Sequence, residues 1–590
     1  MSSAGPRAQI ARAHLTRAVA LGAAALLSLG GGWLYMRFIG NDGTSPLDVL
    51  RTTLFTLVGF WLVWGGVAGV LGILAPPMRA KQSTGRPRGM TAILMPVYNE
   101  DAAASFSRVA AMNRSIVDLG LADRFHFAIL SDTNRDEVAA EEIVWFKQLL
   151  AEPMAEGRVF YRRRERNIGK KAGNIEDFIS RSGGAYDYAL ILDADSLMDG
   201  ATIAAMAKRM DDDPRLGLLQ TVPEVIHAHS LFGRVMQFSA AYLSPYFARG
   251  TALMQGEEGP YWGHNAIVRV PAFAASCGLP VLSGKPPHGG HILSHDYVEA
   301  ALLSRAGWKV EVDPYLGGSY EEGPENLIEY AKRDRRWCQG NLQHRRVLGA
   351  PELKIWSRFT FIQGIMAYAA SPLWLALMAA SILAAALPSK YWWRDNETGI
   401  WVLAVAVGVA LLLPKFLILV RSSLGGRNKG FGGTIRAALS VMAEIVISTL
   451  LAPIMLCFQS KAVIEILLGL DGGWPATNRD EGRVSLATAF AASWWVTVAG
   501  AAVLAISTAF ASDLVPWLLP VALPAIAAPL LIAATSYGSS NGRKRVLFTT
   551  TSETAPAPII VEQQRIFLSW TQQGSALADP TIAGTATAHA

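Results

Sequence analysis

Long apolar stretches recur along the chain, and they restrict its possible folds more than any other feature. A helix crosses a bilayer with about 20 mostly apolar residues. Only 17% of the 590 residues are charged, whereas average soluble domains have roughly 25%. The sequence therefore predicts a multi-pass membrane protein. Its candidate spans are residues 17–39, 51–76, 360–387, 398–420, 435–470, 485–510 and 514–536.

The stretch 435–470 is long enough for two spans, but Pro453, Lys461 and Glu465 interrupt it. Two spans, one span with an interfacial helix, and a re-entrant hairpin all fit this pattern. Basic residues flank the apolar stretches, which indicates that the loops containing them are cytoplasmic. Because these loops then share one side, 435–470 must cross twice or not at all. We predict two crossings, eight spans in total, and both termini in the cytoplasm. The flanking basic residues are Arg7, Arg12, Arg17, Arg79, Lys81, Arg86, Arg88, Arg421, Arg427, Lys429, Arg436, Arg543, Lys544 and Arg545.

These boundaries divide the chain into five parts. We predict a cytoplasmic N-terminus (1–16), two transmembrane helices (17–76), a cytoplasmic α/β domain (77–355), a C-terminal bundle of about six spans (356–540) and a cytoplasmic tail (541–590). The tail is rich in Thr, Ala, Ser and Gln without periodicity, so we predict that it is disordered. The first apolar run is longer than that of a signal peptide, which favours a membrane anchor.

The net charge of +6 does not indicate a nucleic-acid partner. A nucleic-acid site would gather basic residues on one surface, whereas here they collect beside the apolar stretches. We therefore expect membrane lipids, and no nucleic acid, next to these residues.

The part between the second and third spans alternates short β-rich runs with helical stretches. The β-rich runs are 91–98, 126–132, 158–163, 188–195 and 216–222, and the helical stretches include 101–120, 136–152 and 171–182. Such alternation predicts a parallel α/β sheet. Ligands bind beyond the carboxyl ends of the strands in such sheets.

An amphipathic helical pattern follows at residues 225–250. A helix of this kind can lie at the membrane interface, where it would dock the α/β domain against the spans. A helix buried in the core fits the pattern equally well.

Polar residues stand where three of the strands end. Pro96, Tyr98 and Glu100 follow the first strand, as in many nucleotide sites, although a solvated turn is an equal alternative. Asp132 follows the second strand and can accept hydrogen bonds from a uracil or ribose, or cap the next helix. Lys171 follows the third strand among small residues and can pair with a diphosphate. The spacing around it is not that of a P-loop.

Two carboxylates, Asp193 and Asp195, follow the next apolar strand with one alanine between them. Like charges so close repel one another unless a cation lies nearby. Mg²⁺ is commonly held by one or two carboxylates and completed by substrate phosphate. This pattern therefore predicts a site for Mg²⁺ or Mn²⁺ that neutralises a departing diphosphate.

The order of the motifs resembles that of processive family-2 glycosyltransferases, which include cellulose and hyaluronan synthases. Gly263, His264 and Asn265 look like the loop that flanks the acceptor sugar in those enzymes. Ser-His-Asp at 294–296 resembles their Thr-Glu-Asp triplet, with His295 in place of Glu. Arg333–Trp337 resembles their Gln-x-x-Arg-Trp motif, with Arg333 in place of Gln. The resemblance covers about residues 90–350 and rests on these motifs together with Asp132, Asp193, Asp195, Asp296, Arg336 and Trp337.

The resemblance implies a GT-A-like cytoplasmic α/β domain inserted in a polytopic α-helical membrane domain. It also implies UDP-glucose as the donor, a growing glucan as the acceptor, and roles for individual residues. Asp296 would be the catalytic base, Arg336 would pair with the diphosphate, Arg333 would lie at the donor, and Trp337 would stack on the acceptor. Asp296 as a helix cap and Trp337 as membrane-interface packing are the alternatives.

The amino-acid sequence around Asp296 and Trp337 is most similar to that of the synthases of osmoregulated periplasmic glucans. That similarity implies a β-1,2-linked backbone, an inner-membrane location, help with export and a periplasmic glucan-processing partner. We further expect Glu444, at membrane depth, to line a path for the glucan, and residues 474–479 to cover the donor site. A transferase acting on a lipid carrier and a transporter that senses a nucleotide sugar are the competing hypotheses.

Overall fold

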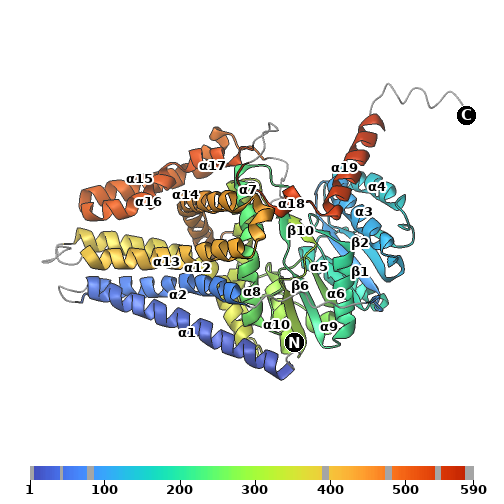
Figure 1. Ribbon diagram of the computed structural model, residues 1–590, viewed down its shortest axis with the longest axis horizontal. Helices are drawn as coiled ribbons and strands as arrows, with labels where there is room; N and C mark the ends of the chain where they lie inside the picture. The colour runs from blue at the N-terminus through green and yellow to red at the C-terminus, as the bar shows by residue number, and fades with distance from the viewer. Residues whose placement is uncertain are drawn as a thin grey trace, which may run out of the picture.

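A bundle of long apolar helices lies beside a mixed α/β domain (Figure 1). The computed structural model describes residues 6–39, 44–75, 85–387, 397–471, 482–538 and 546–577. The expected donor-site cover at 474–479 and the basic cluster at 543–545 lie outside the described residues.

A seven-stranded sheet of order β3-β2-β1-β4-β8-β6-β9 forms the centre of the α/β domain. All five predicted strands are confirmed. The prediction of a parallel sheet is only partly right, because β8 runs antiparallel to both β4 and β6. Ala266 at the start of β8 pairs with Ile191 at the end of β4, so the residues that precede β8 lie beside those that follow β4. The strands are β1 Thr91–Val97, β2 Phe125–Ser131, β3 Val159–Arg163, β4 Tyr188–Ile191, β6 Leu216–Thr221, β8 Ala266–Arg269 and β9 Lys309–Asp313.

Both faces of this sheet are buried. Ile93 and Met95 of β1 face one apolar core, and Ala92 and Leu94 face the other, as expected from the two-residue repeat of a strand. The three predicted helices are confirmed as α3, α4 and α5. The helices of this domain are α3 Ala102–Asp118, α4 Asp136–Leu150, α5 Lys170–Ser182, α6 Gly200–Asp212, α9 Val270–Ser276, α10 His295–Arg305 and α11 Leu327–Gln343.

A second, three-stranded sheet has the order β5-β10-β7. Its central strand β10 (Ser319–Glu322) pairs antiparallel with β5 (Leu197–Met198) and parallel with β7 (Glu224–Ile226). β5 begins two residues after Asp195. The small sheet therefore ties the segment after the two carboxylates to β10 and β7.

Among the described residues, six helices are long and apolar enough to cross a membrane, and a bent pair of shorter helices raises the number to seven. The prediction of eight spans is wrong, because residues 434–467 form one continuous helix with Pro453 inside it. The helices are α1 Pro6–Ile39, α2 Pro46–Leu74, α12 Ile355–Ala386, α13 Glu397–Leu424, α14 Thr434–Leu467, α15 Leu486–Phe510, and the bent pair α16 Val515–Ile526 and α17 Ala528–Ser536.

Helix α14 runs along the α/β domain instead of leading away from it. Near its start, Ala437 and Val441 share an apolar cluster with Tyr242. Near its end, Glu465 forms an ion pair with Arg335 of α11 at 3.1 Å. Because both ends contact the α/β side, this arrangement matches the alternative in which the segment contributes no crossing.

Glu444, in the middle of α14, is buried. Both of its carboxylate oxygens accept hydrogen bonds from Lys415 of α13, at 2.7 and 2.9 Å. The burial of Glu444 is explained by this ion pair, and its place along a glucan path stays a prediction.

The amphipathic segment at 225–250 forms two helices, α7 (Leu231–Tyr242) and α8 (Ser244–Gln255). They lie between the bundle and the sheet in Figure 1. Gly250 of α8 meets Gly72 of α2 so closely that a Cβ at either position would collide with the other helix's backbone. The predicted docking of the α/β domain against the spans is confirmed.

The prediction of a disordered tail is wrong for residues 546–577. They form α18 (Thr551–Thr554) and α19 (Pro558–Leu577), and α19 lies against α3 on the side away from the bundle (Figure 1). Its buried Ile560 and Ile566 join the core of the sheet, and Trp570 stacks on Trp145 with ring centroids 5.8 Å apart. Burial of each such side chain stabilises the fold by roughly 1.5–3 kcal/mol. The polar composition of the segment gave no indication of this burial. Short 3₁₀ turns complete the fold at η1 Ala122–Arg124, η2 Gly183–Ala185, η3 His344–Arg346, η4 Arg427–Phe431 and η5 Ser512–Leu514.

Candidate active site

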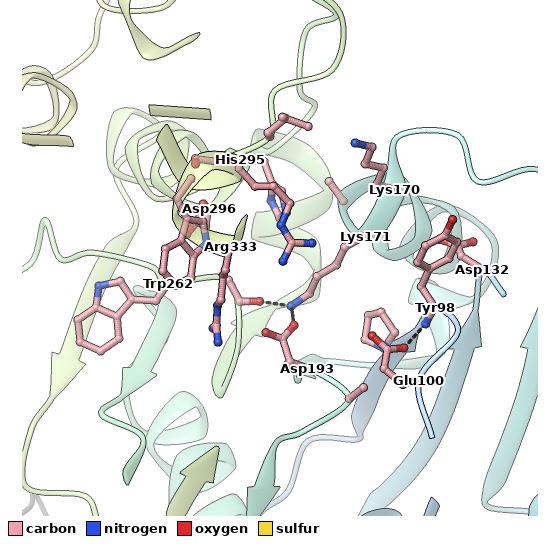
Figure 2. Close-up of a pocket in the computed structure, with 18 of the residues that line it drawn as sticks. Tyr98, Glu100, Asp132, Lys170, Lys171, Asp193, Trp262, His295, Asp296 and Arg333 are labelled. Carbon is pink, nitrogen blue, oxygen red and sulfur yellow. Dashed lines mark hydrogen bonds and ion pairs between the residues drawn. The ribbon is translucent and has the colours of Figure 1, made fainter. Parts of the chain in front are cut away.

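A pocket of about 260 Å³ opens at the carboxyl ends of β1, β2 and β4, and α10 and α11 close its other side. Figure 2 shows Tyr98, Glu100 and Asp132 on one side and Trp262 and Asp296 on the other. Most of the predicted site residues line it together. They are Pro96, Tyr98, Glu100, Asp132, Lys171, Asp193, Gly263, Asp296, Arg333, Arg336 and Trp337. Three predicted residues are not part of its lining, namely Asp195, His264 and Asn265.

Lys171 and Asp193 form an ion pair in the middle of the pocket (Figure 2). Lys171, in the first turn of α5, also donates to the carbonyl oxygen of Gly263 at 2.7 Å. Burial alone would raise the pKa of Asp193, but the cations Lys171 and His264 outweigh it and hold that pKa well below its usual range. Asp193 is therefore a fixed negative charge, and Lys171 is a cation already positioned at the pocket floor.

His264 lies beneath the pocket, where it supports Asp193. Its Nε2 is 2.6 Å from Glu321 and its Nδ1 is 3.7 Å from Asp193. Burial lowers the pKa of His264, but the two carboxylates outweigh that effect and raise the pKa to about 9. The imidazolium lies between two carboxylates, and the contact of His264 with an acceptor stays a prediction.

Asn265 is fully buried and does not line the pocket, so its contact with an acceptor stays a prediction. Its amide donates to the Ser319 hydroxyl at 2.9 Å and to the Tyr320 carbonyl at 3.2 Å. These bonds attach the loop before β8 to strand β10. Asn265 is a structural residue of that junction.

Asp132 is held in place by Arg164. The guanidinium donates two parallel hydrogen bonds to the carboxylate, both 2.7 Å long, a geometry that fixes orientation as well as charge. The alternative role as a helix cap is wrong, because the N-cap residue of α4 is Arg135 and its side chain makes no capping bond. Asp132 thus remains available at the end of β2 to a ligand in the pocket.

The first turn of the site is closed by Glu100, whose carboxylate accepts a hydrogen bond from the backbone of Tyr98 (Figure 2). Asn99 between them adopts φ 57°, and its backbone N–H donates to the Thr133 hydroxyl at 3.0 Å. These contacts join the ends of β1 and β2 into one rim.

Asp296 lies in the first turn of α10, which begins at His295 after the N-cap residue Ser294. Asp296 is therefore not the N-cap of this helix. Burial raises the pKa of Asp296 to about 6, and the like charge of Glu299 adds to the rise, while His295 opposes it. Gly263 faces this carboxylate with φ 85°, and a Cβ there would lie 3.6 Å from the Cβ of Asp296. A carboxyl with this pKa can accept a proton near neutral pH.

Helix α11 brings Arg333, Arg336 and Trp337 to the pocket. Residues three and four positions apart share a helix face. The Arg333 guanidinium lies 4.6 Å from the centre of the Trp337 ring, and 41% of Trp337 is exposed. An indole that lines the pocket and is partly exposed is suited to stack on a sugar ring.

The two carboxylates predicted to bind a cation were tested against their surroundings. Among the described residues, no group of three His, Cys, Asp or Glu side chains could hold a metal by itself. Asp193 lines the pocket, whereas Asp195 is buried just behind it. Two oxygen donors fit a Mg²⁺ or Mn²⁺ ion that takes its other ligands from phosphate and water. The residues present therefore fit a cation that arrives with its substrate.

Several lining residues were not predicted. His295 belongs to the Ser-His-Asp motif, and Trp262 directly precedes Gly263 of the predicted acceptor loop, so the sequence offered a signal for both. Glu322 ends β10, Glu329 lies in the first turn of α11 and Glu325 lies between these two elements. No recognisable motif contains them, and only the fold brings them to the pocket.

Comparisons with known proteins agree with this geometry. Residues 92–276 match the family model of glycosyl transferase family 2, and residues 188–419 match that of glycosyl transferase family group 2. The fold and the site thus define a family-2 glycosyltransferase with a GT-A-like domain.

The chain is 51% identical to the glucans biosynthesis glucosyltransferase H of Cereibacter sphaeroides, over 96% of this chain and 97% of the relative. It is 38% identical to the protein of the same name from Xanthomonas euvesicatoria pv. vesicatoria, over 90% of this chain and 86% of that relative. The chain belongs to this family of glucan glucosyltransferases, and the resemblance inferred from the motifs is confirmed.

A solved structure with a similar fold is the mannosyltransferase PcManGT from Pyrobaculum calidifontis in complex with GDP-Man and Mn²⁺. It matches with a TM-score of 0.44 and 15% identity, over 71% of this chain and 99% of that one.

Proposed function

We propose that this chain polymerises glucose from UDP-glucose into a β-glucan backbone, with inversion at the anomeric carbon. The observation that carries the proposal is the shared pocket. It holds a carboxyl group with a pKa of about 6, Asp296, together with the Lys171–Asp193 pair and the exposed indole of Trp337. A proton acceptor, a diphosphate cradle and a sugar platform are the three parts that the reaction requires.

The donor binds at the ends of β1, β2 and β4. Asp132 accepts hydrogen bonds from the uridine, and Lys171 and Arg336 offset the diphosphate charge. Asp193 and Asp195 would hold Mg²⁺ or Mn²⁺, which when bound stabilises the negative charge of the leaving UDP. Arg333 lies beside Trp337 at the junction between donor and acceptor.

Asp296 acts as the general base. It takes the proton from the acceptor hydroxyl, and the hydroxyl oxygen forms a bond to the anomeric carbon on the face opposite UDP. The bond from that carbon to the β-phosphate oxygen breaks, and its electron pair leaves with UDP. A single displacement converts the α-linked donor into a β-linked product. The proton on Asp296 then passes to solvent, and at pH 7 the carboxyl is again mostly ionised because its pKa is about 6.

The product leaves along the side of the pocket where Trp337 stacks the acceptor. Helix α11, which bears this tryptophan, packs against α12 and α14 of the apolar bundle. Asp334 of α11 also accepts a hydrogen bond from Gln459 of α14 at 2.9 Å. Contact between the acceptor helix and the bundle supports a role in exporting the glucan.

Three successive pairs of helices support a topology with six crossings and a cytoplasmic α/β domain. They are α1 with α2, which pack together, α12 and α13, which both pack on α2, and α15 with the bent α16–α17, while α14 lies at the interface. Arg17 near the start of α1 donates to the Met254 carbonyl of α8 at 2.6 Å. Arg427, in the basic loop after α13, donates to the Tyr242 carbonyl at 2.8 Å. Basic flanks in contact with the α/β domain support its cytoplasmic location at the inner membrane.

The finer identity of the product follows the named relatives, which synthesise glucans. We propose an osmoregulated periplasmic glucan with a β-1,2-linked backbone, and a periplasmic glucan-processing protein as a partner.

The test uses the purified full-length chain in lipid nanodiscs with Mg²⁺. We expect UDP release from UDP-glucose, little release from UDP-galactose or GDP-mannose, and a polymer whose linkage analysis gives 2-linked glucose. A product with one added sugar on a lipid would favour the lipid-carrier transferase. Absence of UDP release from UDP-glucose would reject the proposed donor.

A further inference from the structure

The turn that carries Asp193 and Asp195 is held from behind by Arg108 of α3. This arginine is buried, and its Nη1 donates to the carbonyl oxygen of Ala194, between the two carboxylates, at 3.0 Å. Its Nη2 donates to Glu322 Oε1 at 2.7 Å. A single planar guanidinium thus joins the turn to the end of strand β10.

Glu322 in turn is bonded to His227, which follows β7. The Nδ1 of His227 lies 3.1 Å from Glu322 Oε1. Burial raises the pKa of Glu322, but Arg108 and His227 outweigh it and lower the pKa to about 2, so the carboxylate stays charged. His227 adopts φ 62°, a backbone region uncommon for residues other than glycine, so its ring is held where the local backbone alone would not favour it.

The other nitrogen of this ring reaches the C-terminal helix. His227 Nε2 is 3.0 Å from the Gln564 amide nitrogen of α19. The amide N–H donates to Nε2, and Nδ1–H donates to Glu322. An unbroken series of hydrogen bonds therefore runs from α19 through His227, Glu322 and Arg108 to the Ala194 carbonyl.

The small sheet follows the same route through the backbone. Glu322 of β10 pairs with Ile226 of β7, which immediately precedes His227. Tyr320 of β10 pairs with Leu197 of β5, which follows the turn. Side-chain bonds and strand pairing thus connect the same three segments independently.

We propose that Arg108 and His227 are positioning residues that act through Glu322 to hold the Asp193–Asp195 turn, and that docking of α19 tightens this turn for a nucleoside diphosphate. The ligand class rests on the proposed function, because that function assigns the turn to the diphosphate. Neither Arg108 nor His227 lines the pocket. The C-terminal helix is then a support of the donor site, although it lies outside the pocket.

Amide hydrogen exchange of the full-length chain in nanodiscs tests the connection without depending on the reaction. The backbone N–H of Asp193 donates to the Ser196 hydroxyl at 2.9 Å and that of Ser196 donates to the Asp193 carbonyl at 3.0 Å, so exchange at these amides reports on the turn. Arg108→Lys keeps the positive charge but loses the planar guanidinium that donates to both Ala194 and Glu322. We expect about tenfold faster exchange in residues 193–196, since one charge-assisted bond contributes about that much. Gln564→Leu should make exchange in the same residues about threefold faster.

Arg565→Gln is the matched control, because Arg565 is exposed beside Gln564 and, within the described part of the chain, bonds only to Glu562. In Arg565→Gln, the amides of residues 193–196 should exchange at the wild-type rate. Combining Arg108→Lys with Gln564→Leu should add nothing to Arg108→Lys alone, since both act through one series of bonds. Wild-type exchange at 193–196 in Gln564→Leu, or additive effects in the double variant, would overturn the proposal. If Arg108→Lys does not fold, Gln564→Leu against Arg565→Gln decides alone.

Kinetics supply the second readout. Gln564→Leu should raise KM for UDP-glucose about threefold with kcat nearly unchanged, because support from behind the pocket alters binding geometry more than chemistry. A fall in kcat alone would overturn the assignment of Gln564 to the donor turn. A wild-type chain that releases no UDP from UDP-glucose would refute the proposed function, and the exchange data would still decide this inference.

Discussion

The proposed donor and acceptor sides of the pocket are organised in opposite ways. On the donor side, Asp132 is fixed by Arg164 and Asp193 by Lys171. On the acceptor side, no other side chain of the described residues is hydrogen-bonded to the carboxylate of Asp296, and Trp337 is partly exposed. The donor side is prebuilt for a constant, charged ligand. The acceptor side keeps a proton acceptor unengaged and a platform open for a sugar chain that changes at every cycle.

The largest effect should come from the acceptor side. Asp296→Asn removes the base but keeps the size of the side chain, and we expect kcat to fall by about 10²–10⁴-fold, the usual contribution of a general base. Affinity for UDP should stay near that of the wild type, because the donor side is untouched. Steady-state UDP release and UDP binding by calorimetry measure the two quantities.

Asp136→Asn is a suitable control, because Asp136 is 97% exposed in its side chain at the start of α4. It should leave both quantities unchanged. An Asp296→Asn variant that lost UDP affinity but kept its kcat would mean that the two sides are not separable as described.

On the donor side, Lys171→Met should weaken substrate use about 10²-fold in kcat/KM. The change leaves Asp193 without its ion-pair partner and removes a cation from the diphosphate cradle, and each charge-assisted bond contributes about 1.5–3 kcal/mol. The loss in kcat/KM should appear mainly as a rise in KM for UDP-glucose.

Arg181→Met serves as the comparison on the same helix, since Arg181 has a side chain that is 74% exposed and does not line the pocket. Its kinetics should match the wild type. If Lys171→Met lowered kcat with KM unchanged, Lys171 would act in the chemical step and the division between the two sides would fail.

The same comparison shows what the sequence could predict. Motifs at strand ends and the Arg-Arg-Trp run identified Asp132, Lys171, Asp193 and Trp337, because parallel strands place their carboxyl ends at one edge. Spacing could not show that His264 and Asn265 do not line the pocket. Their position depends on strand β8, which runs antiparallel to its neighbours. The short sequence of this strand gives no indication of its direction.

Two larger errors have a common cause. The predictions of two spans in 435–470 and of a disordered tail at 541–590 both rest on the local composition of these segments. Their structure is decided by distant partners, namely Arg335 for α14 and the α3 core surface for α19. Tertiary contacts of this kind leave no periodic trace in a single sequence.

The pH dependence sharpens the comparison further. Asp296 must be ionised to act, and its pKa is raised to about 6, so kcat/KM should fall as pH drops through about 6 and reach roughly one tenth of its plateau at pH 5. Asp193 should not contribute to this fall, because its pKa is held low. A plateau that continues down to pH 5 in the profile of UDP release would show that Asp296 is not the base.

The smallest effect concerns the sugar platform. Trp337→Ala removes a stacking surface that contributes about 0.5–1.5 kcal/mol beyond its buried area, so we expect UDP release to fall only several-fold. The polymer, separated by size, should be shorter, because a weakly held acceptor dissociates before the next addition. Trp337→Phe keeps an aromatic face and should restore most of the length. If the alanine variant made full-length polymer, the exposed indole would only pack against Arg333 and the membrane side, and the acceptor would have to be held by other residues of α10 and α11.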